Sequence, residues 1–547
     1  MKKTVMEAVS RALGQMGLRP APRVEVEVPR EEAHGDLSTP VAMGLAKELR
    51  KPPREIARDI ARALPGEEAF EKVEVAGPGF LNFTFRADFL RERLRELLRE
   101  GPALLREDLG RGRRVQVEFV SANPTGPLHL GHGRGAAVGA ALSNLLREAG
   151  FAVEREYYIN DAGRQVELLG RSVLARYREA LGVEAPFPED GYKGAYVEDL
   201  ARALQEEVGE VYRDSTFQEC REKVVDFALA HMLTRIREDL QAFGVQFDTW
   251  QSERELYDEG AVEHALTVMR ERGILYEAEG ALWFRATRYG DEKDRVVVKS
   301  DGQHTYFASD IAYHLRKLER GFDELINVWG ADHHGYVPRL EAVMEALAGE
   351  RKKLRVLLVQ MVALERGGKP VQMSKRAGEF VTLREVIDEI GADTAKFIFL
   401  TRRHDSHLTL DLEAAVAQSA ENPVYYIQYA TARIHSIFAH AGEQGVETES
   451  LESADLAPLA EAEELRLIKK LLTYPIVFEQ AVRNREPHRM TFYLQELAGM
   501  FHPYYNRHRV VTEDVALTRA RLALMKAIVL SFSEGLRILG VSAPKKM

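Results

Sequence analysis

Cysteine is almost absent from this sequence, because its 547 residues include only Cys220. One cysteine excludes a disulfide framework or a thiolate zinc cluster within the chain. Long apolar runs are also lacking, so we expect no membrane span. The first residues, MKKTVMEAVSRALGQMG, are basic, but their apolar positions recur at helical spacing, which favours a surface helix over a signal peptide. We therefore expect a cytoplasmic protein.

An excess of positive charge is missing as well. The formal net charge is −10, which excludes an indiscriminately basic nucleic-acid binder. Local patches remain, at RGRR (111–114), RKKLR (351–355) and RNREPHR (483–489), and local patches determine the field that a phosphate backbone meets. Each patch taken alone is typical of a solvated surface. The charge pattern therefore leaves a nucleic-acid partner open.

The chain is too long for one hydrophobic core, and its periodicity predicts several domains. Alternating strands and helices predict a parallel α/β sheet, with strands at 115–120, 152–159, 324–331 and 355–364. We also expect strands at 23–28 and within 72–86, and helices alone between 160 and 272 and after about 415. The predicted domains are a small α+β unit at 1–105, an α/β domain at 106–365 with a helical insertion at about 165–272, a connecting region at 366–415, and an all-α bundle at 416–547.

One turn between a predicted strand and helix carries paired imidazoles: ANPTGPLHLGHGRG (122–135) places His129 and His132 three residues apart. A metal site is disfavoured because no thiolate or carboxylate lies in the turn, although His333 and His334 could add imidazoles. A purely structural glycine turn is the second alternative. The position favours a third, since a turn that opens a helix after a parallel strand binds phosphate through backbone N–H groups. The turn matches neither GxGxxG nor GxxxxGK[ST], which disfavours a redox dinucleotide or a simple kinase-type fold.

A second segment can complete such a site. The stretch GGKPVQMSKRAG (367–378) places Lys375 and Arg376 between glycines. A lysine in this context can stabilise a leaving pyrophosphate without covalent chemistry.

Together, HLGH and QMSKR resemble the paired signatures of class I aminoacyl-tRNA synthetases, and the rest of the chain resembles the arginyl-tRNA synthetases. Nearly the whole sequence takes part in this resemblance. The stretches are HGDLSTPVAM (34–43), AGPGFLNFTF (76–85), EFVSANPTGPLHLGHGRG (118–135), YYINDAGRQ (157–165), SDGQHTYFASDIAYHL (300–315), WGADHHGYVPRL (329–340), MSKRAGEFVTL (373–383), ENPVYYIQYATARIHSI (421–437) and LRILGVSAP (536–544).

The resemblance implies a Rossmann-type catalytic domain, an additional N-terminal domain and an anticodon-binding bundle. It implies that arginine and Mg²⁺-ATP form arginyl-adenylate and pyrophosphate, and that arginine then passes to the terminal adenosine of tRNA(Arg). No zinc and no redox cofactor are expected. The implied catalytic residues are His129, His132 and Lys375, and the implied ATP-binding set is Pro124, Gly126, His129, Gly131, His132, Asp332, His333, Met373, Ser374 and Lys375. Gln372 and Arg376 depart from the usual KMSKS signature, which leaves open whether Lys369 compensates.

A guanidinium substrate is planar and permanently charged, so its site should offer carboxylates and flat partners. By the resemblance, the arginine-binding residues are Glu118, Ser121, Asn123, His132, Tyr306, Asp310 and His333. Taken alone, each acidic residue is more typical of a helix cap or a surface ion pair. Asn160, Asp161 and Gln165 belong to the same rim or support it from behind.

Aromatic and basic residues alternate in MFHPYYNRHRV (500–510), a pattern that stacks unpaired bases and holds the backbone. We expect Tyr425, Tyr426 and Phe501 in the bundle core. The predicted tRNA contacts are Tyr504, Tyr505, Asn506, Arg507 and Arg509. By the resemblance, the N-terminal domain touches the tRNA elbow. We expect a monomer with no membrane association.

Three other functions fit parts of the pattern. A small-molecule nucleotidyltransferase also uses an HxGH turn and a lysine loop, but such chains are shorter and lack the helical bundle. A cysteinyl-type synthetase needs a zinc-bound pocket that one cysteine cannot furnish. A catalytically inactive tRNA-binding relative is disfavoured by the intact HLGH, Lys375, Glu118 and Asp310.

Overall fold

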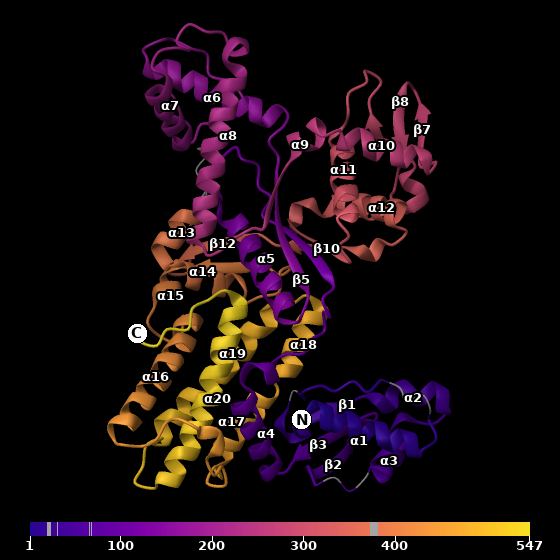
Figure 1. The fold of residues 1–547 in the computed structure, drawn as a ribbon, viewed down its shortest axis with the longest axis vertical. Coiled ribbons are helices and arrows are strands. Elements are labelled where there is room, and N and C mark those ends of the chain that lie inside the picture. The colour runs from indigo at the N-terminus through magenta and orange to yellow at the C-terminus, as the bar shows by residue number, and fades with distance from the viewer. Residues whose placement is uncertain (19–22, 30, 65, 67, 372–380) are drawn as a thin grey trace. The chain divides into compact units, whose positions relative to one another are not determined.

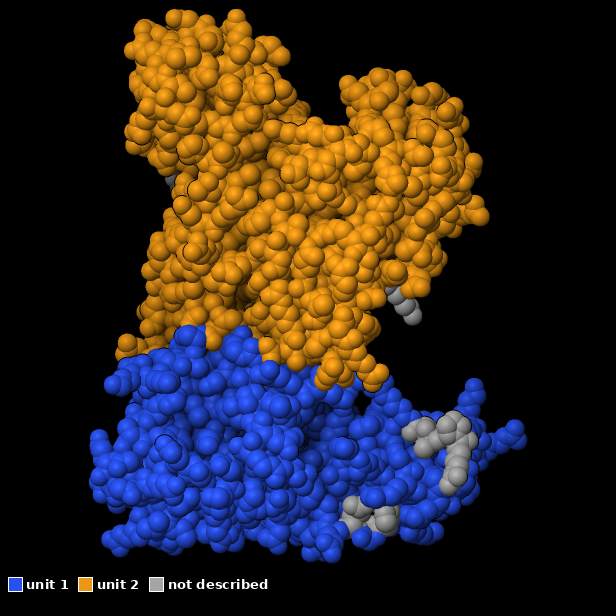
Figure 2. Space-filling view, viewed as in Figure 1, with its two compact units in different colours: residues 1–107, 426–537, 542–547 blue, residues 108–425, 538–541 orange. Residues whose placement is uncertain are grey.

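The computed structural model describes residues 1–18, 23–29, 31–64, 66, 68–371 and 381–547. The chain divides into two compact units, which Figure 2 colours separately. Unit 1 comprises residues 1–107, 426–537 and 542–547, and unit 2 comprises residues 108–425 and 538–541. Expected site residues 373–375, with Gln372 and Arg376, lie outside the described residues.

Unit 2 is built around a five-stranded parallel sheet, ordered β11-β10-β4-β5-β6. Its strands are β4 (Arg114–Phe119), β5 (Ala152–Ile159), β6 (Thr249–Ser252), β10 (Glu324–Gly330) and β11 (Leu354–Val359). The chain starts in the middle with β4, proceeds through β5 to β6 at one edge, and returns to build β10 and β11 on the other side. The strand order therefore reverses between β4 and β10, where open α/β sheets bind their ligands.

The rest of unit 2 contains helices and two small sheets (Figure 1). The helices are α5 (Leu130–Glu148), α6 (Arg164–Ala180), α7 (Ala195–Val208), α8 (Phe217–Ala242), α9 (Glu253–Asp258), α10 (Ala261–Glu271), α11 (Tyr306–Glu319), α12 (Val337–Ala348), α13 (Leu383–Ile390), α14 (Ala392–Phe399) and α15 (Leu412–Val416). One small sheet holds β7 (Leu275–Ala278), β8 (Ala281–Phe284) and β9 (Arg295–Val298), and the other holds β12 (Val362–Arg366), β13 (Lys369–Pro370) and β14 (Leu408–Asp411).

Unit 1 combines a small α+β part with a helical bundle. The α+β part contains α1 (Lys2–Gln15), β1 (Leu37–Thr39), α2 (Val41–Leu49), α3 (Pro53–Ala63), β2 (Phe70–Ala76), β3 (Phe80–Phe85) and α4 (Ala87–Glu100). The bundle contains α16 (Pro423–Glu443), α17 (Ala462–Leu472), α18 (Tyr474–Asn484), α19 (His488–Arg507) and α20 (Val515–Leu539). The predicted fold class, an α/β domain with a small α+β part and an all-α bundle, is confirmed.

Four local predictions were wrong. Residues 23–28 form no strand: they make one isolated bridge, from Glu27 to Ser38 on β1, although Val24 and Val26 are buried at alternate positions as in a strand. The run 355–364 is split between β11 and β12, which belong to different sheets. Strand β6 interrupts the expected all-helical stretch, and β7, β8 and β9 were missed. Each of these strands has only four residues, too few for periodicity to reveal.

Candidate active site

The loop after β4 opens the site with a strained backbone. Val120 and Ser121 have φ values of 67° and 40°, which are unusual for residues other than glycine and costly for a β-branched valine. The surroundings hold this loop in place: Ser121 Oγ accepts a hydrogen bond from the Tyr158 N–H at 3.1 Å, and the Tyr157 hydroxyl donates to the Ala122 carbonyl at 2.8 Å. The strained turn therefore lies where the strand order reverses.

The paired histidines cap the N-terminus of α5. His129 Nδ1 accepts from the Gly131 N–H at 3.1 Å, and His132 Nδ1 accepts from the His129 N–H at 3.2 Å. The rings stack with centroids 3.7 Å apart and planes inclined by 22°. Serine or aspartate usually performs this capping. Because each Nδ1 accepts, each neutral ring carries its proton on Nε2.

Burial keeps both imidazoles neutral. It lowers the pKa of His132 to about 3, an effect that neighbouring His129 reinforces. It also lowers the pKa of His129, which Asp332 partly opposes. At neutral pH the histidines therefore offer N–H donors, not positive charges, beside the positive end of the α5 dipole. Gly131 leaves room for them, since a Cβ there would lie 3.0 Å from His129 Cε1.

The backbone joins this histidine turn to the chain that follows the second signature. The Leu130 N–H donates to the Val381 carbonyl at 3.2 Å, and the Leu383 N–H donates to the Leu128 carbonyl at 2.7 Å. His129 and Thr382 form an antiparallel bridge between them. Two segments about 250 residues apart in sequence thus meet at the N-terminus of α5.

A cluster of carboxylates lies at the carboxyl side of the sheet. Asp310, on α11, accepts a hydrogen bond from the Tyr336 hydroxyl. Glu253, at the start of α9, is 3% exposed and accepts from Ser309 Oγ at 3.0 Å. Glu118, near the end of β4, pairs with Lys317 at 2.6 Å. Sequence reasoning missed Glu253, because an acidic residue in a first helical turn is ordinarily a capping residue.

The pKa of Asp310 is raised in this cluster. Burial is the main cause that raises the pKa of Asp310 to about 7, and Glu253 and Glu118 add to the effect. Burial also raises the pKa of the Tyr158 hydroxyl, again reinforced by Glu253, Asp310 and Glu118. The cluster is therefore a buried, electronegative site that favours a cationic ligand.

The remaining expected residues line the same edge. Asn123 Nδ2 donates to Gln165 Oε1 at 2.6 Å, and Tyr306 is 66% exposed at the start of α11. Exposed Asp332 and His333 follow β10, with their side chains 3.6 Å apart.

Two more sets of expected residues lie nearby. Pro124 is buried, and Gly126 faces Tyr196, whose hydroxyl would lie 3.3 Å from a Cβ. The Asp161 carboxylate accepts hydrogen bonds from Ser252 Oγ at 2.7 Å and from the Arg254 N–H at 3.0 Å, which indicates a supporting role.

In the bundle, one expected tRNA contact is wrong. Tyr504 is 1% exposed and donates to Glu464 at 3.1 Å, because its position on α19 faces the core. Tyr505 is half-buried, and Arg433 lies over both its ring and that of Tyr429, at 4.4 and 4.5 Å. Asn506, Arg507 and Arg509 are exposed. Of the three expected core aromatics, Phe501 is fully buried, whereas Tyr425 and Tyr426 are half-buried.

Within the described ranges, no helix is long and apolar enough to cross a membrane. The same ranges contain no group of three or more His, Cys, Asp or Glu residues that could hold a metal ion.

Comparisons with known proteins cover the whole chain. Residues 94–436 match the class I (R) catalytic domain of tRNA synthetases, residues 2–85 the arginyl-tRNA synthetase N-terminal domain, and residues 427–547 the DALR anticodon-binding domain. The arginine–tRNA ligase of Citrifermentans bemidjiense is 52% identical over 96% of this chain and 95% of its own. That of Syntrophotalea carbinolica is 51% identical over 100% and 99%. The solved arginyl-tRNA synthetase of Thermus thermophilus is 26% identical, with a TM-score of 0.77 and complete coverage of both chains.

Two glycines of α5 provide a test of the junction at the histidine turn. A Cβ on Gly133 would lie 2.7 Å from Leu383 and 3.2 Å from Phe399, whereas a Cβ on Gly135 meets nothing within 4 Å. We expect Gly133→Ala to destabilise the protein by about 1–3 kcal/mol through overpacking. Gly135→Ala should be neutral or stabilising by up to ~1 kcal/mol, since alanine favours helix. Thermal melting of both variants checks this, and equal melting temperatures would contradict it.

Proposed function

Because this chain belongs to the arginyl-tRNA synthetases, we propose that Glu118, Glu253 and Asp310 form its arginine pocket. The protein is an arginine–tRNA ligase, and the predicted enzyme class is confirmed. It uses ATP, arginine and tRNA(Arg). The observation that supports the pocket is the cluster of buried Glu118 and Glu253 with half-buried Asp310, whose pKa is raised to about 7. A guanidinium would neutralise these carboxylates and donate hydrogen bonds to them. Ser121, Asn123, Tyr306, His132 and His333 complete the proposed set around the amino acid.

We propose that the histidine turn binds the ATP phosphates. The neutral rings of His129 and His132 donate from Nε2 to phosphate oxygens, whose negative charge increases as pyrophosphate leaves. Gly131 lets the adenosine approach the backbone, and the N-terminus of α5 adds its dipole. Pro124, Gly126, Asp332 and His333 line the same site in this proposal. Met373, Ser374 and Lys375 would approach from the second signature, which is joined to the turn at residues 381–383.

Neither step requires a covalent enzyme intermediate. The arginine carboxylate attacks the α-phosphate of ATP, the bond to pyrophosphate breaks, and the adenylate forms. The terminal ribose hydroxyl of the tRNA then attacks the arginyl carbonyl and releases AMP. Positioning and charge stabilisation account for both steps.

We infer that Mg²⁺ arrives with ATP and is held mainly by phosphate oxygens and water. We further infer a monomer, because one chain contributes every residue of the proposed pocket, and a cytoplasmic location, as befits a translation enzyme.

We propose that tRNA contacts the bundle around Tyr505, Asn506, Arg507 and Arg509. An aromatic ring beside exposed cations can stack an unpaired base and hold its phosphate. Tyr504 is left out because it is buried.

The proposed role of His132 predicts a loss of adenylate formation in His132→Ala. We expect arginine-dependent pyrophosphate exchange into ATP to fall by about 10²–10³ when one transition-state donor is removed. The assay is run with and without tRNA, and we expect the wild-type enzyme to exchange only with tRNA present. Unchanged exchange in a folded variant would remove His132 from the transition state. Absence of wild-type exchange under both conditions would contradict the proposed site.

Asp310 predicts a pH-dependent affinity for arginine. Its pKa in the empty pocket is raised to about 7, so the carboxyl is protonated below that pH and must lose its proton to pair with a guanidinium. The KM for arginine should therefore rise about tenfold per pH unit below pH 7 and level off above it. Asp310→Asn should raise the KM at pH 8 and flatten the profile. A wild-type KM independent of pH between 5.5 and 8 would refute the assignment.

The proposed tRNA-binding surface predicts that substitutions of the adjacent residues Tyr504 and Tyr505 affect the KM for tRNA differently. Tyr505→Ala and Arg507→Ala should each raise the KM for tRNA by about five- to a hundredfold, as expected for a lost stacking or phosphate contact. Arginine affinity should not change. Tyr504→Phe is the matched control, since it removes only the hydrogen bond to Glu464 and should leave the tRNA KM unaltered. These KM values come from aminoacylation kinetics. If Tyr504→Phe raised the tRNA KM while Tyr505→Ala and Arg507→Ala left it unchanged, the proposed tRNA contact would be wrong.

A further inference from the structure

Behind the proposed arginine pocket lies a lysine that the mechanism does not use. Lys317, on α11, is 0% exposed. Its Nζ donates to Glu118 Oε2 at 2.6 Å and to Asn327 Oδ1 at 3.4 Å, and lies 4.0 Å from the ring centroid of Tyr313. Lysine is almost never fully buried unless it is paired. The pairing of its ammonium group with the Glu118 carboxylate accounts for this burial.

Hydrogen bonds connect this ion pair to Asp310. Asn327, on β10, stands in register with Glu118 on β4. Because its Oδ1 accepts from Lys317, its amide N–H₂ donates to His314 Nε2, 3.3 Å away. His314 then carries its proton on Nδ1, which donates to the Asp310 carbonyl at 2.8 Å. This series of hydrogen bonds thus runs from Lys317 through Asn327 and His314 to the main chain of Asp310.

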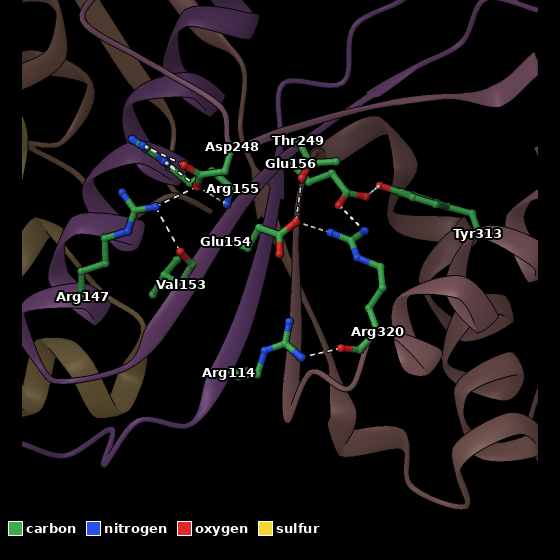
Figure 3. A network of polar contacts seen from close by, with 10 residues as sticks. All are labelled: Arg114, Arg147, Val153, Glu154, Arg155, Glu156, Asp248, Thr249, Tyr313 and Arg320. Carbon is green, nitrogen blue, oxygen red and sulfur yellow. Dashed lines mark hydrogen bonds and ion pairs between the residues drawn. The ribbon is translucent and has the colours of Figure 1, made fainter. Parts of the chain in front are cut away.

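Figure 3 shows a second ion pair, between Glu156 and Arg320, in which Glu156 also binds the Tyr313 hydroxyl. The Tyr313 hydroxyl donates to Glu156 Oε1 at 2.6 Å, and Arg320 donates to Glu156 Oε2 at 2.5 Å. Arg320 also pairs with Glu154. Arg320 thus forms the ion pair with Glu156, and Lys317 forms the one with Glu118.

We propose that Lys317 is a positioning residue for the substrate arginine. Its contact with Glu118 Oε2 at 2.6 Å holds that carboxylate in one orientation, although Glu253 and Asp310 lie close by. Without it, the Glu118 carboxylate would turn away from its like-charged neighbours, because closely spaced carboxylates repel one another. Lys317 touches no reacting atom and acts only through Glu118. This inference rests on the proposed function, because it concerns the pocket defined there.

The test is a double-mutant cycle on the KM for arginine, with Lys317→Met, Glu118→Gln and the double variant. We expect Lys317→Met to raise the arginine KM about tenfold, with kcat and the ATP KM changed less than about threefold. Adding Lys317→Met to Glu118→Gln should raise the arginine KM no further. Thermal melting should show each single variant destabilised and the double variant recovered, since no uncompensated charge remains buried. If Lys317→Met does not fold, the arginine KM of the double variant is compared with that of Glu118→Gln alone. Equal values support the inference, and a higher value in the double variant contradicts it.

Lys396→Met is the control for simple destabilisation. Lys396 is also buried, lies in the same unit and donates to the Gly540 carbonyl, away from the pocket. It should lower the melting temperature without moving the arginine KM. An unchanged arginine KM in folded Lys317→Met, or equal increases in both Glu118 backgrounds, would overturn the inference. If Glu118→Gln and Asp310→Asn also leave the arginine KM unchanged, the proposed pocket itself is wrong.

Discussion

The catalytic unit depends on how it compensates buried negative charge. A carboxylate that is buried in or beside its parallel sheet loses its hydration shell. A cation or a bound proton must then compensate the negative charge. Glu118 and Glu156 are nearly or fully buried, and each pairs with a cation, Lys317 and Arg320 respectively. Asp310 instead accepts from Tyr336 and has its pKa raised to about 7. The compensation missing at Asp310 is what a guanidinium would supply.

The histidine turn, the proposed phosphate site, follows a different rule, because it offers neutral N–H donors and no positive side-chain charge. A cation at the N-terminus of α5 would be repelled by the helix dipole. Burial removes this conflict by keeping His129 and His132 unprotonated. Their capping bonds simultaneously direct the remaining proton of each ring to Nε2. The same capping geometry therefore gives backbone N–H groups at the start of α5 an acceptor and leaves each Nε2–H as a donor suited to a polyanion.

Backbone hydrogen bonds join the histidine turn to residues 381–383, which follow the second signature in the sequence. The segment 381–383 pairs with residues 128–130, so the chain leaving the second signature is anchored at the histidine turn. A Cβ at position 133 would crowd the side chains of Leu383 and Phe399, so glycine suits this junction. The proposed transfer chemistry relies on this proximity, because positioning supplies much of its acceleration.

Sequence alone determined the features that depend on local patterns. Alternation and helical spacing identified β4, β5, β10 and the bundle, and the histidine turn was recognisable because its glycines, imidazoles and flanking elements are contiguous. Only the tertiary structure decided what depends on distant partners: the addition of Glu253 to the carboxylates, the pairing of Glu118 with Lys317, and the burial of Tyr504 beside half-buried Tyr505. The physical reason is that burial and charge compensation arise from contacts between segments far apart in the chain, which no local period records.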